Sequence, residues 1–209
     1  QWNWGDPGAL FIDRFNEYNL LSGYDNFHIL TTNPCAEAPL GAWGSCNLGS
    51  INLAKFVDAN EGQFHWGPFI DTVHVAVRAL NDALDYSYDK QPYEENRKYI
   101  RDWRPIGLGV FGYADMLVEL GLEYGSEEAL EFTERLFRCL MNEAVKASAF
   151  LSNDYFNTFG EYNYDKTAKS ELFQSLDDDT KACVMKYGLL NGQIISVAPT
   201  GSISLLAGR

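Results

Sequence analysis

Basic residues are scarce in this chain. Its 209 residues include 16 Lys and Arg against 29 Asp and Glu, which gives a formal net charge of −13 at pH 7. No cluster of Lys or Arg occurs, and binding to a nucleic-acid backbone depends on such clusters because they release counterions. The composition therefore argues against a nucleic-acid partner. It also means that an anionic small substrate needs local donors that overcome an unfavourable overall field, or positive charge supplied by other chains.

Long apolar runs are absent as well. No stretch reaches the ~18 apolar residues from which a membrane span is recognised, so we expect no membrane association. Residues 1–8 have neither the basic segment nor the apolar stretch of a signal peptide. The four cysteines have no framework-like spacing, which suits a reducing compartment better than a disulfide-stapled secreted protein. We expect a cytoplasmic protein.

Metal-ligand patterns are also missing. The three histidines, His28, His65 and His74, have no metal-ligand spacing with each other or with the cysteines, so no metal site is predicted. Two cysteines, Cys139 and Cys183, fall within predicted helices and are interpreted as structural.

The apolar pattern predicts an α/β or α+β chain in which helices dominate; we take the fold class as α/β. The first helix is expected at 9–18, with Asp6 as its N-cap and Pro7 at its first position. Further helices are expected at 67–88, up to 120 before Gly121, from Ser126 onward and at 177–187. Short strands are expected at 27–32, 46–53 and 193–197, and a loop at 153–169.

The most informative segment is Asn33-Pro34-Cys35-Ala36-Glu37. In extended backbone, with a rise of roughly 3.3 Å per residue, its amide, thiol and carboxylate line one face. A lone cysteine is more often inert core. However, Glu37 is costly to bury without a partner, and Asn33 has four hydrogen-bonding valences to satisfy. Three such groups on one face predict a polar ligand between them, and Cys46 supplies a second thiol eleven positions later.

Two glycine-containing segments are candidate ligand sites. A strand that leads into Pro199-Thr200-Gly201-Ser202-Ile203 and then into a helix exposes free N–H groups and a positive dipole end, which suits a phosphate group. An ordinary N-cap explains the same residues equally well. The segment 107–112 lacks the spacing of a dinucleotide fingerprint, and we interpret its glycines as allowing close helix packing.

Taken together, these blocks resemble the catalytic subunit of ribonucleotide reductase, most closely its adenosylcobalamin-dependent (class II) branch. The resemblance covers nearly the whole chain, and its blocks occur in the order found in that family. They are Gly5-Asp6-Pro7-Gly8, Asn33-Pro34-Cys35-Ala36-Glu37, Ser45-Cys46-Asn47-Leu48, Arg104-Pro105-Ile106-Gly107-Leu108-Gly109-Val110 and Pro199-Thr200-Gly201-Ser202-Ile203.

The resemblance implies a ten-stranded α/β barrel with a finger loop at about 33–46. Cys35 would be the thiyl-radical cysteine that abstracts the 3′ hydrogen of a ribonucleotide, and an apolar, dry setting would favour its S–H form. Glu37 would take the 3′-hydroxyl proton, and Asn33 would hydrogen-bond the substrate. Cys46 would be one half of the dithiol that reduces C2′. The substrate would contact 33–37 and the phosphate turn at 199–204, chiefly Pro199, Thr200, Gly201, Ser202 and Ile203.

The resemblance further implies that residues 1–209 form a single partial catalytic barrel domain from a larger protein. The substrate would be a ribonucleoside diphosphate or triphosphate, and adenosylcobalamin would be the cofactor, with an incomplete binding surface here. A thioredoxin-type reductant, the missing N- and C-terminal parts and a second copy in a homodimer would be the partners. The chain alone is expected to be inactive.

Three alternatives remain open. A class I large subunit would depend on a separate radical-generating subunit, although the eleven-residue spacing from Cys35 to Cys46 favours class II. A non-catalytic scaffold would keep the barrel half without its chemistry. A simple dithiol oxidoreductase using Cys35 and Cys46 fits less well, because such enzymes favour closely spaced cysteines at a helix N-terminus.

Overall fold

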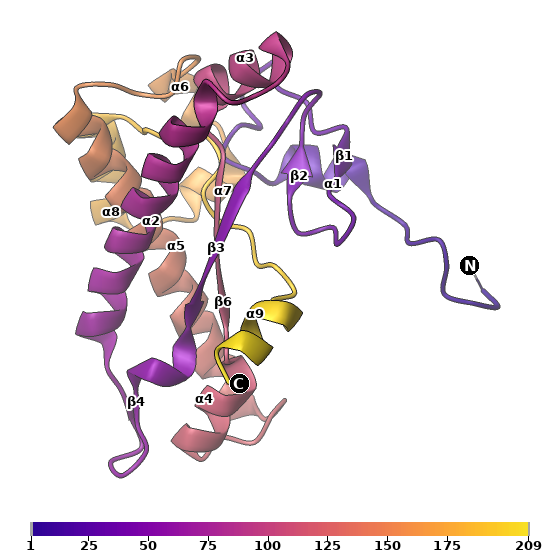
Figure 1. The fold of residues 1–209 in the computed structure, drawn as a ribbon. Coiled ribbons are helices and arrows are strands. Elements are labelled where there is room, and N and C mark those ends of the chain that lie inside the picture. The colour runs from indigo at the N-terminus through magenta and orange to yellow at the C-terminus, as the bar shows by residue number, and fades with distance from the viewer. Residues whose placement is uncertain (1, 209) are drawn as a thin grey trace.

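Two parallel strands form the centre of the structure, a computed structural model that describes residues 2–208 (Figure 1). Strand β3 (Asn47–Asn52) pairs with β6 (Ile106–Phe111), with Asn47 opposite Ile106. The segment 193–196 lies along the other edge of β6. The Ile106 N–H donates to the Gln193 carbonyl at 3.0 Å, and the Ser196 N–H donates to the Leu108 carbonyl at 3.0 Å. Three extended segments therefore form a short parallel wall.

Helix α2 (Trp66–Tyr88) lies between β3 and β6 in the chain and covers one face of this wall. Its residues Val73, Val77, Leu80 and Leu84 are all buried, and their spacing of three to four residues places them on one face of the helix. Behind it packs α5 (Glu127–Tyr155), whose N-cap is Ser126. The Ser126 side chain accepts a hydrogen bond from the Ala129 N–H, so the predicted start of this helix is confirmed.

The remaining elements are short, and the α/β class is confirmed. They are α1 (Ile12–Glu17), β1 (Thr31–Thr32), β2 (Pro39–Leu40), the 3-10 helix η1 (Leu53–Phe56), β4 (Val57–Asp58), β5 (Gln63–Phe64), α3 (Glu94–Trp103), α4 (Tyr113–Leu120), α6 (Tyr164–Thr167), α7 (Glu171–Gln174), α8 (Asp178–Tyr187) and α9 (Gly201–Leu206). The end residues of the expected domain, Gln1 and Arg209, lie outside the described residues.

Several predicted elements were wrong in extent. The first helix begins at Ile12, and Asp6 is not its N-cap; residues 2–11 are exposed, so no packing stabilises a helix there. Within 27–32 only Thr31 and Thr32 form a strand. The expected loop at 153–169 contains the end of α5 and the whole of α6. The segment 193–197 forms a single bridge at Ile195 rather than a full strand.

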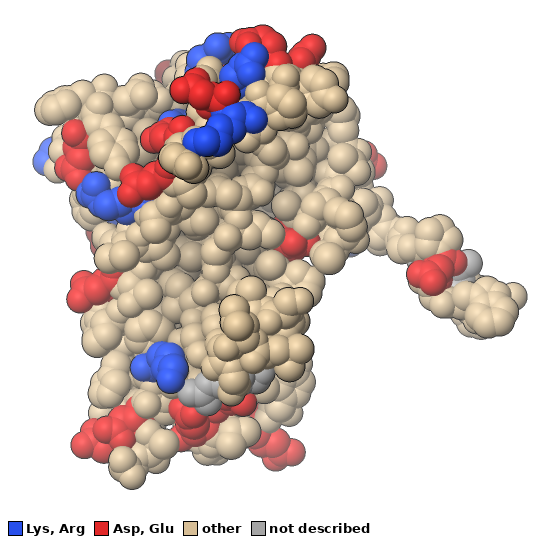
Figure 2. Space-filling view, viewed as in Figure 1, with Lys and Arg blue, Asp and Glu red and all other residues tan. Residues whose placement is uncertain are grey.

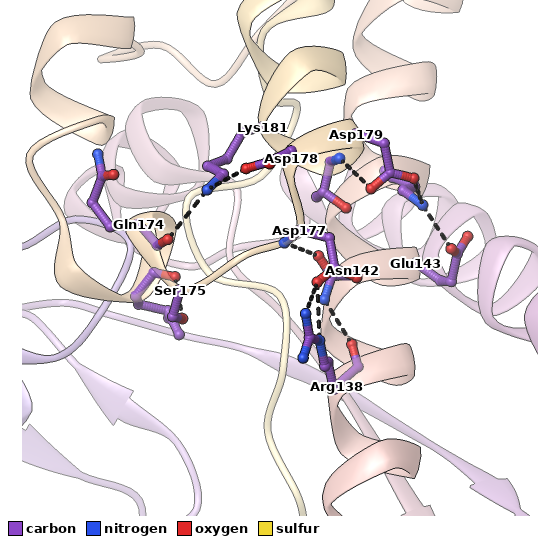
Figure 3. Close-up of polar contacts among 12 residues, drawn as sticks. Arg138, Asn142, Glu143, Gln174, Ser175, Asp177, Asp178, Asp179 and Lys181 are labelled. Carbon is purple, nitrogen blue, oxygen red and sulfur yellow. Dashed lines mark hydrogen bonds and ion pairs between the residues drawn. The ribbon is translucent and has the colours of Figure 1, made fainter.

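Polar contacts fasten α8 to α5 on the outer side of the molecule (Figure 3). The Asn142 Oδ1 accepts from the Asp177 N–H at 2.8 Å, and Arg138 pairs with Asp177 at 2.6 Å. One turn further along α5, Lys146 pairs with Glu143 at 2.9 Å and with Asp179 at 2.7 Å. These contacts anchor the first turn of α8 without involving the central wall.

Charged side chains avoid the middle of the face that carries β3, β2 and α9. Figure 2 shows them gathered over α3 at one end and near α4 at the other, with few between. Among residues 2–208, no helix combines the length and the apolarity needed to cross a membrane. The same residues contain no group of three or more His, Cys, Asp or Glu side chains arranged to hold a metal ion.

Candidate active site

The Asn-Pro-Cys-Ala-Glu segment forms the tip of a hairpin between β1 and β2, which we call the finger hairpin (residues 31–40). Thr31 pairs with Leu40, and Thr32 pairs with Pro39. The expectation of a single extended face was therefore wrong. The chain turns sharply inside 33–38, and Ala36 has a left-handed backbone with φ 67°.

Asn33 closes this turn with both its backbone and its side chain. Its N–H donates to the Ala38 carbonyl at 3.2 Å, and its Oδ1 accepts from the Ala38 N–H at 3.0 Å. Its carbonyl accepts from the Ala36 N–H at 3.0 Å. An asparagine is well suited to this task, because its short amide can mimic a backbone group in a turn.

The three chemical groups of the segment lie in different settings. Cys35 is exposed at the tip, between the exposed residues Pro34 and Ala36, so the expected dry setting for this thiol is absent from the described part of the chain. Glu37 is half-buried. Its Oε2 is fully buried and has no hydrogen-bond partner among the described residues. A buried carboxylate oxygen without a partner costs free energy unless a ligand completes it.

Cys46 lies immediately before β3 and is half-buried. Its S–H donates to the Asn47 carbonyl at 3.5 Å. Burial raises the pKa of the Cys46 thiol to about 12, and the nearby negative charge of Glu37 adds to the rise. The structure therefore brings Glu37 and Cys46 into one electrostatic environment and keeps the Cys46 sulfur protonated at neutral pH.

Gly107 on β6 allows Cys46 and Ser196 to approach the strand closely. A Cβ atom at Gly107 would lie 3.1 Å from the Cys46 Sγ and 2.9 Å from the Ser196 Cβ. Ser196 in turn donates its Oγ–H to the Glu37 carbonyl at 2.8 Å. The two glycines of β6 thus serve close packing between neighbouring extended segments rather than between helices, since a Cβ at Gly109 would lie 2.6 Å from the Ser196 carbonyl oxygen. Our interpretation of 107–112 as helix packing was wrong in this respect.

Tyr99 and Gln193 contribute to the site although sequence reasoning missed them. Tyr99, on α3, accepts a hydrogen bond from the Gly41 N–H at 3.3 Å and donates to the Gln193 Oε1 at 3.1 Å. The Gln193 Nε2 donates to the Pro39 carbonyl at 2.7 Å. One signal was available: Gln193 and Ser196 are the polar residues in the otherwise apolar run 193–198.

The predicted phosphate turn lies at the start of α9. Thr200 has φ 60°, and its carbonyl accepts the Ser204 N–H at 2.9 Å. The N–H groups of residues 201–203 precede this first helical bond and have no backbone partner among the described residues. Two hydroxyl groups of this turn are already used as donors within it, because the Thr200 Oγ1 donates to the Pro199 carbonyl and the Ser204 Oγ donates to the Gly201 carbonyl, each at 2.8 Å.

Comparison with known proteins identifies the architecture. A sequence model of the family described as "Ribonucleotide reductase, barrel domain" matches residues 1–209. The chain belongs to this family. Within the ribonucleotide reductase family, the chain is 39% identical over 204 residues to a vitamin B12-dependent ribonucleoside-diphosphate reductase of Mycobacterium tuberculosis (strain CDC 1551 / Oshkosh). It is 36% identical over 207 residues to the protein of the same name from Thermoplasma acidophilum.

These alignments cover 98% and 99% of the chain but only 26% and 24% of the two relatives. The chain thus spans about a quarter of the length of the curated reductases that it matches. Among solved structures, the α subunit of a class Id ribonucleotide reductase from Actinobacillus ureae superposes with a TM-score of 0.71 at 21% identity. That match covers 99% of the chain and 35% of the subunit, and it supports the reductase barrel as the fold.

Proposed function

We propose that the intact protein containing this chain reduces ribonucleotides to 2′-deoxyribonucleotides by a thiyl-radical mechanism. Residues 1–209 would then be one partial catalytic barrel domain, inactive without the rest of the protein. The observation that carries the proposal is the unpartnered, buried Oε2 of Glu37, which lies in the charge environment of Cys46 and on the hairpin that presents Cys35.

In this proposal the substrate ribose supplies the missing hydrogen-bond partner of the Glu37 carboxylate. Cys35, as a thiyl radical, takes the 3′ hydrogen and becomes a thiol, while Glu37 accepts the proton of the 3′-hydroxyl. The 2′-hydroxyl leaves as water. Cys46 and a second cysteine outside this chain supply two electrons and two protons and form a disulfide. The 3′ hydrogen then returns to C3′, Glu37 returns its proton to the 3′ oxygen, and the thiyl radical on Cys35 is restored.

The pKa of Cys46 is consistent with this role. A donor of hydrogen to a carbon-centred radical must carry its proton on sulfur, and a thiol with a pKa of about 12 does so throughout the physiological range. The same property makes Cys46 a weak nucleophile, which argues against the simple dithiol oxidoreductase. In that alternative a reactive thiolate would be needed for exchange.

The phosphate group of the substrate would lie at the start of α9. The exposed residues Gly201, Ser202 and Ile203 offer N–H groups without backbone partners in the described residues, and a helix start favours an anion. Ser196 precedes this turn by three residues and holds the Glu37 carbonyl. Recognition by neutral donors also suits a chain whose net charge is −13.

Adenosylcobalamin is proposed as the radical source. Among the described residues, the tip of the finger hairpin suits this cofactor. The Cys35 thiol is exposed there between two uncharged residues, Pro34 and Ala36. The bound cofactor would supply the radical, and Cys35 would be the residue of this chain that faces it. The two relatives described above carry vitamin B12 dependence in their names, which favours this class over a class I subunit with a radical-generating partner.

The names of these relatives specify diphosphates, and we extend this substrate class to the intact protein. A thioredoxin-type reductant would reduce the disulfide formed by Cys46 and so restore its thiol, and the intact protein would form a homodimer in the cytoplasm.

Serine and glutamine variants of the intact enzyme test the proposal. Cys35→Ser should abolish deoxyribonucleotide formation, because an alcohol O–H does not replace the thiol in hydrogen-atom transfer. Glu37→Gln should lower kcat by about 10²–10⁴-fold, the usual contribution of a placed acid or base. Cys139→Ser, on α5, is the matched control and should retain activity.

Full turnover by Cys35→Ser, with adenosylcobalamin and a dithiol present, would contradict the mechanism and favour the scaffold alternative. Turnover that requires a separate metal-containing subunit instead of adenosylcobalamin would indicate class I.

A further inference from the structure

The segment 193–196 binds the central wall with its backbone and the finger hairpin with its side chains. Gln193 accepts the Ile106 N–H at its carbonyl and donates its Nε2 to the Pro39 carbonyl at 2.7 Å. Ser196 donates its backbone N–H to Leu108 and its Oγ–H to the Glu37 carbonyl at 2.8 Å. Two side chains three residues apart thus hold two carbonyls of the hairpin that are two residues apart.

The orientation of the Gln193 amide is fixed from both ends. Its Oε1 accepts from the Tyr99 hydroxyl, and its Nε2 donates to a carbonyl. Interchanging the amide oxygen and nitrogen would therefore lose hydrogen bonds. Tyr99 is 6% exposed, and Ser196 is 6% exposed. The hydrogen bonds that these side chains make are partly buried, and such bonds are stronger than exposed ones because water competes less.

The finger hairpin needs this support because its own pairing is minimal. Strands β1 and β2 share only two residue pairs, and two-stranded hairpins of this kind are marginal in water. Cys35 and Glu37 therefore depend on contacts outside the hairpin for their position.

The same segment continues directly into the proposed phosphate turn. From Ser196 to Pro199 the chain advances three residues, about 10 Å if extended. In Figure 1 this yellow segment passes between β6 and β2 before it enters α9. The group that would hold the phosphate and the groups that would act on the ribose are thus connected through one stretch of backbone.

We propose that Gln193 and Ser196, with Tyr99 orienting Gln193, are positioning residues that fix the finger hairpin relative to the phosphate turn. They set the placement of Cys35 and Glu37 against a ribose whose phosphate is bound at 200–203. The catalytic consequence of this inference rests on the proposed function. The hydrogen bonds made by Gln193, Ser196 and Tyr99, which we call the clamp, can be measured without activity. Displacement of a catalytic group by ~1 Å can cost about 10²-fold in rate, so a loosened hairpin should act on kcat.

The test uses Gln193→Leu and Ser196→Ala in the intact enzyme. The matched controls are Gln174→Leu and Ser175→Ala, which remove a side-chain bond to a backbone carbonyl of the same kind at an exposed helix end (Figure 3). Each clamp variant should lower kcat at least about 10-fold with KM within about 3-fold, because the phosphate turn is unchanged. The isotope effect for substrate deuterated at C3′ should rise, since hydrogen abstraction becomes slower.

Hydrogen exchange provides the readout that does not need turnover. The Asn33 and Ala38 amides, both bonded inside the hairpin, should exchange at least about 10-fold faster in the clamp variants, while amides in the middle of α2 keep their protection. If Gln193→Leu fails to fold, Tyr99→Phe removes only a hydroxyl and should shift the same amides and kcat in the same direction.

Hairpin exchange and kcat equal to those of the controls would overturn the inference, as would a rise in KM with unchanged kcat. Faster hairpin exchange in an intact protein that never reduces ribonucleotides would support the clamp and refute the proposed function instead.

Discussion

The two thiols of the candidate site occupy opposite settings. Cys35 is exposed at the tip of a hairpin with two residue pairs, whereas Cys46 is half-buried at the start of a six-residue parallel strand. Burial and the Glu37 charge raise the pKa of Cys46 to about 12. The strand directly after Cys46 is held by its pairing with β6, while the hairpin relies on side chains from Asn33, Gln193 and Ser196.

This difference separates two ways of placing a reactive group. Cys46 is placed by the paired strand that follows it, and burial protects it from ionisation. A clamped hairpin leaves Cys35 open to a radical source on its outer side. The proposed chemistry needs both, because one sulfur must be reached by the cofactor and the other must keep its proton until the substrate requires it.

Thiol alkylation should give the largest contrast. With iodoacetamide at pH 8, Cys35 should react about 10³-fold faster than Cys46, because a thiol with a pKa of about 12 is ~10⁻⁴ ionised at that pH. The Cys46 rate should then rise about tenfold per pH unit from pH 8 towards pH 11. Peptide mass spectrometry resolves the two sites, and the Cys46 profile should be the same in Cys35→Ser. Equal rates at pH 8 would remove the contrast on which this comparison is built.

A larger side chain at position 107 should destabilise the packing around β6 without changing a residue of the finger hairpin. Gly107→Ala would place its Cβ 2.4 Å from the Leu48 Cδ2 and 2.9 Å from the Ser196 Cβ. Overpacking of this kind costs about 1–3 kcal/mol in the free energy of unfolding. Gly67→Ala, where nothing lies within 4 Å of the new Cβ, is the control and should be neutral or slightly stabilising. Urea unfolding measures both, and an unchanged midpoint for Gly107→Ala would show that the packing at β6 is loose.

The smallest effect is expected inside the hairpin. Asn33→Ala removes the acceptor of the Ala38 N–H, and Asn33→Asp keeps it. Loss of this bond should speed exchange of the Ala38 amide about tenfold in the alanine variant, equivalent to about 1.4 kcal/mol. In the aspartate variant the change should stay below about threefold. Identical exchange in both variants would mean that the turn is held by its backbone bonds alone.

The helical part of this fold could be predicted from the sequence because its signals are local. The spacing of Val73, Val77, Leu80 and Leu84 fixed the buried face of α2, and Ser126 marked the start of α5. Burial is harder to predict at the edges of such faces: Leu130 is an apolar residue of α5 but is 60% exposed.

The site was only partly predictable, because its geometry depends on distant contacts. Residue types at 33–37 pointed to chemistry, but the turn at Ala36 and the side-chain bond from Asn33 replaced the expected extended face. The role of Gly107 depends on Cys46 and Ser196, which come from distant segments and would both lie within 3.1 Å of a Cβ atom at this position. No local pattern connects Gln193 with Pro39, which lies 154 residues away.

A structure of the intact enzyme with a bound ribonucleoside diphosphate would test the central claim most directly. We predict the ribose between Cys35 and Cys46, with its 3′-hydroxyl within hydrogen-bond distance of the Glu37 Oε2 and its phosphate on the amides of 201–203. A ribose bound elsewhere, or a Glu37 carboxylate that stays unpartnered with the nucleotide in place, would contradict the account.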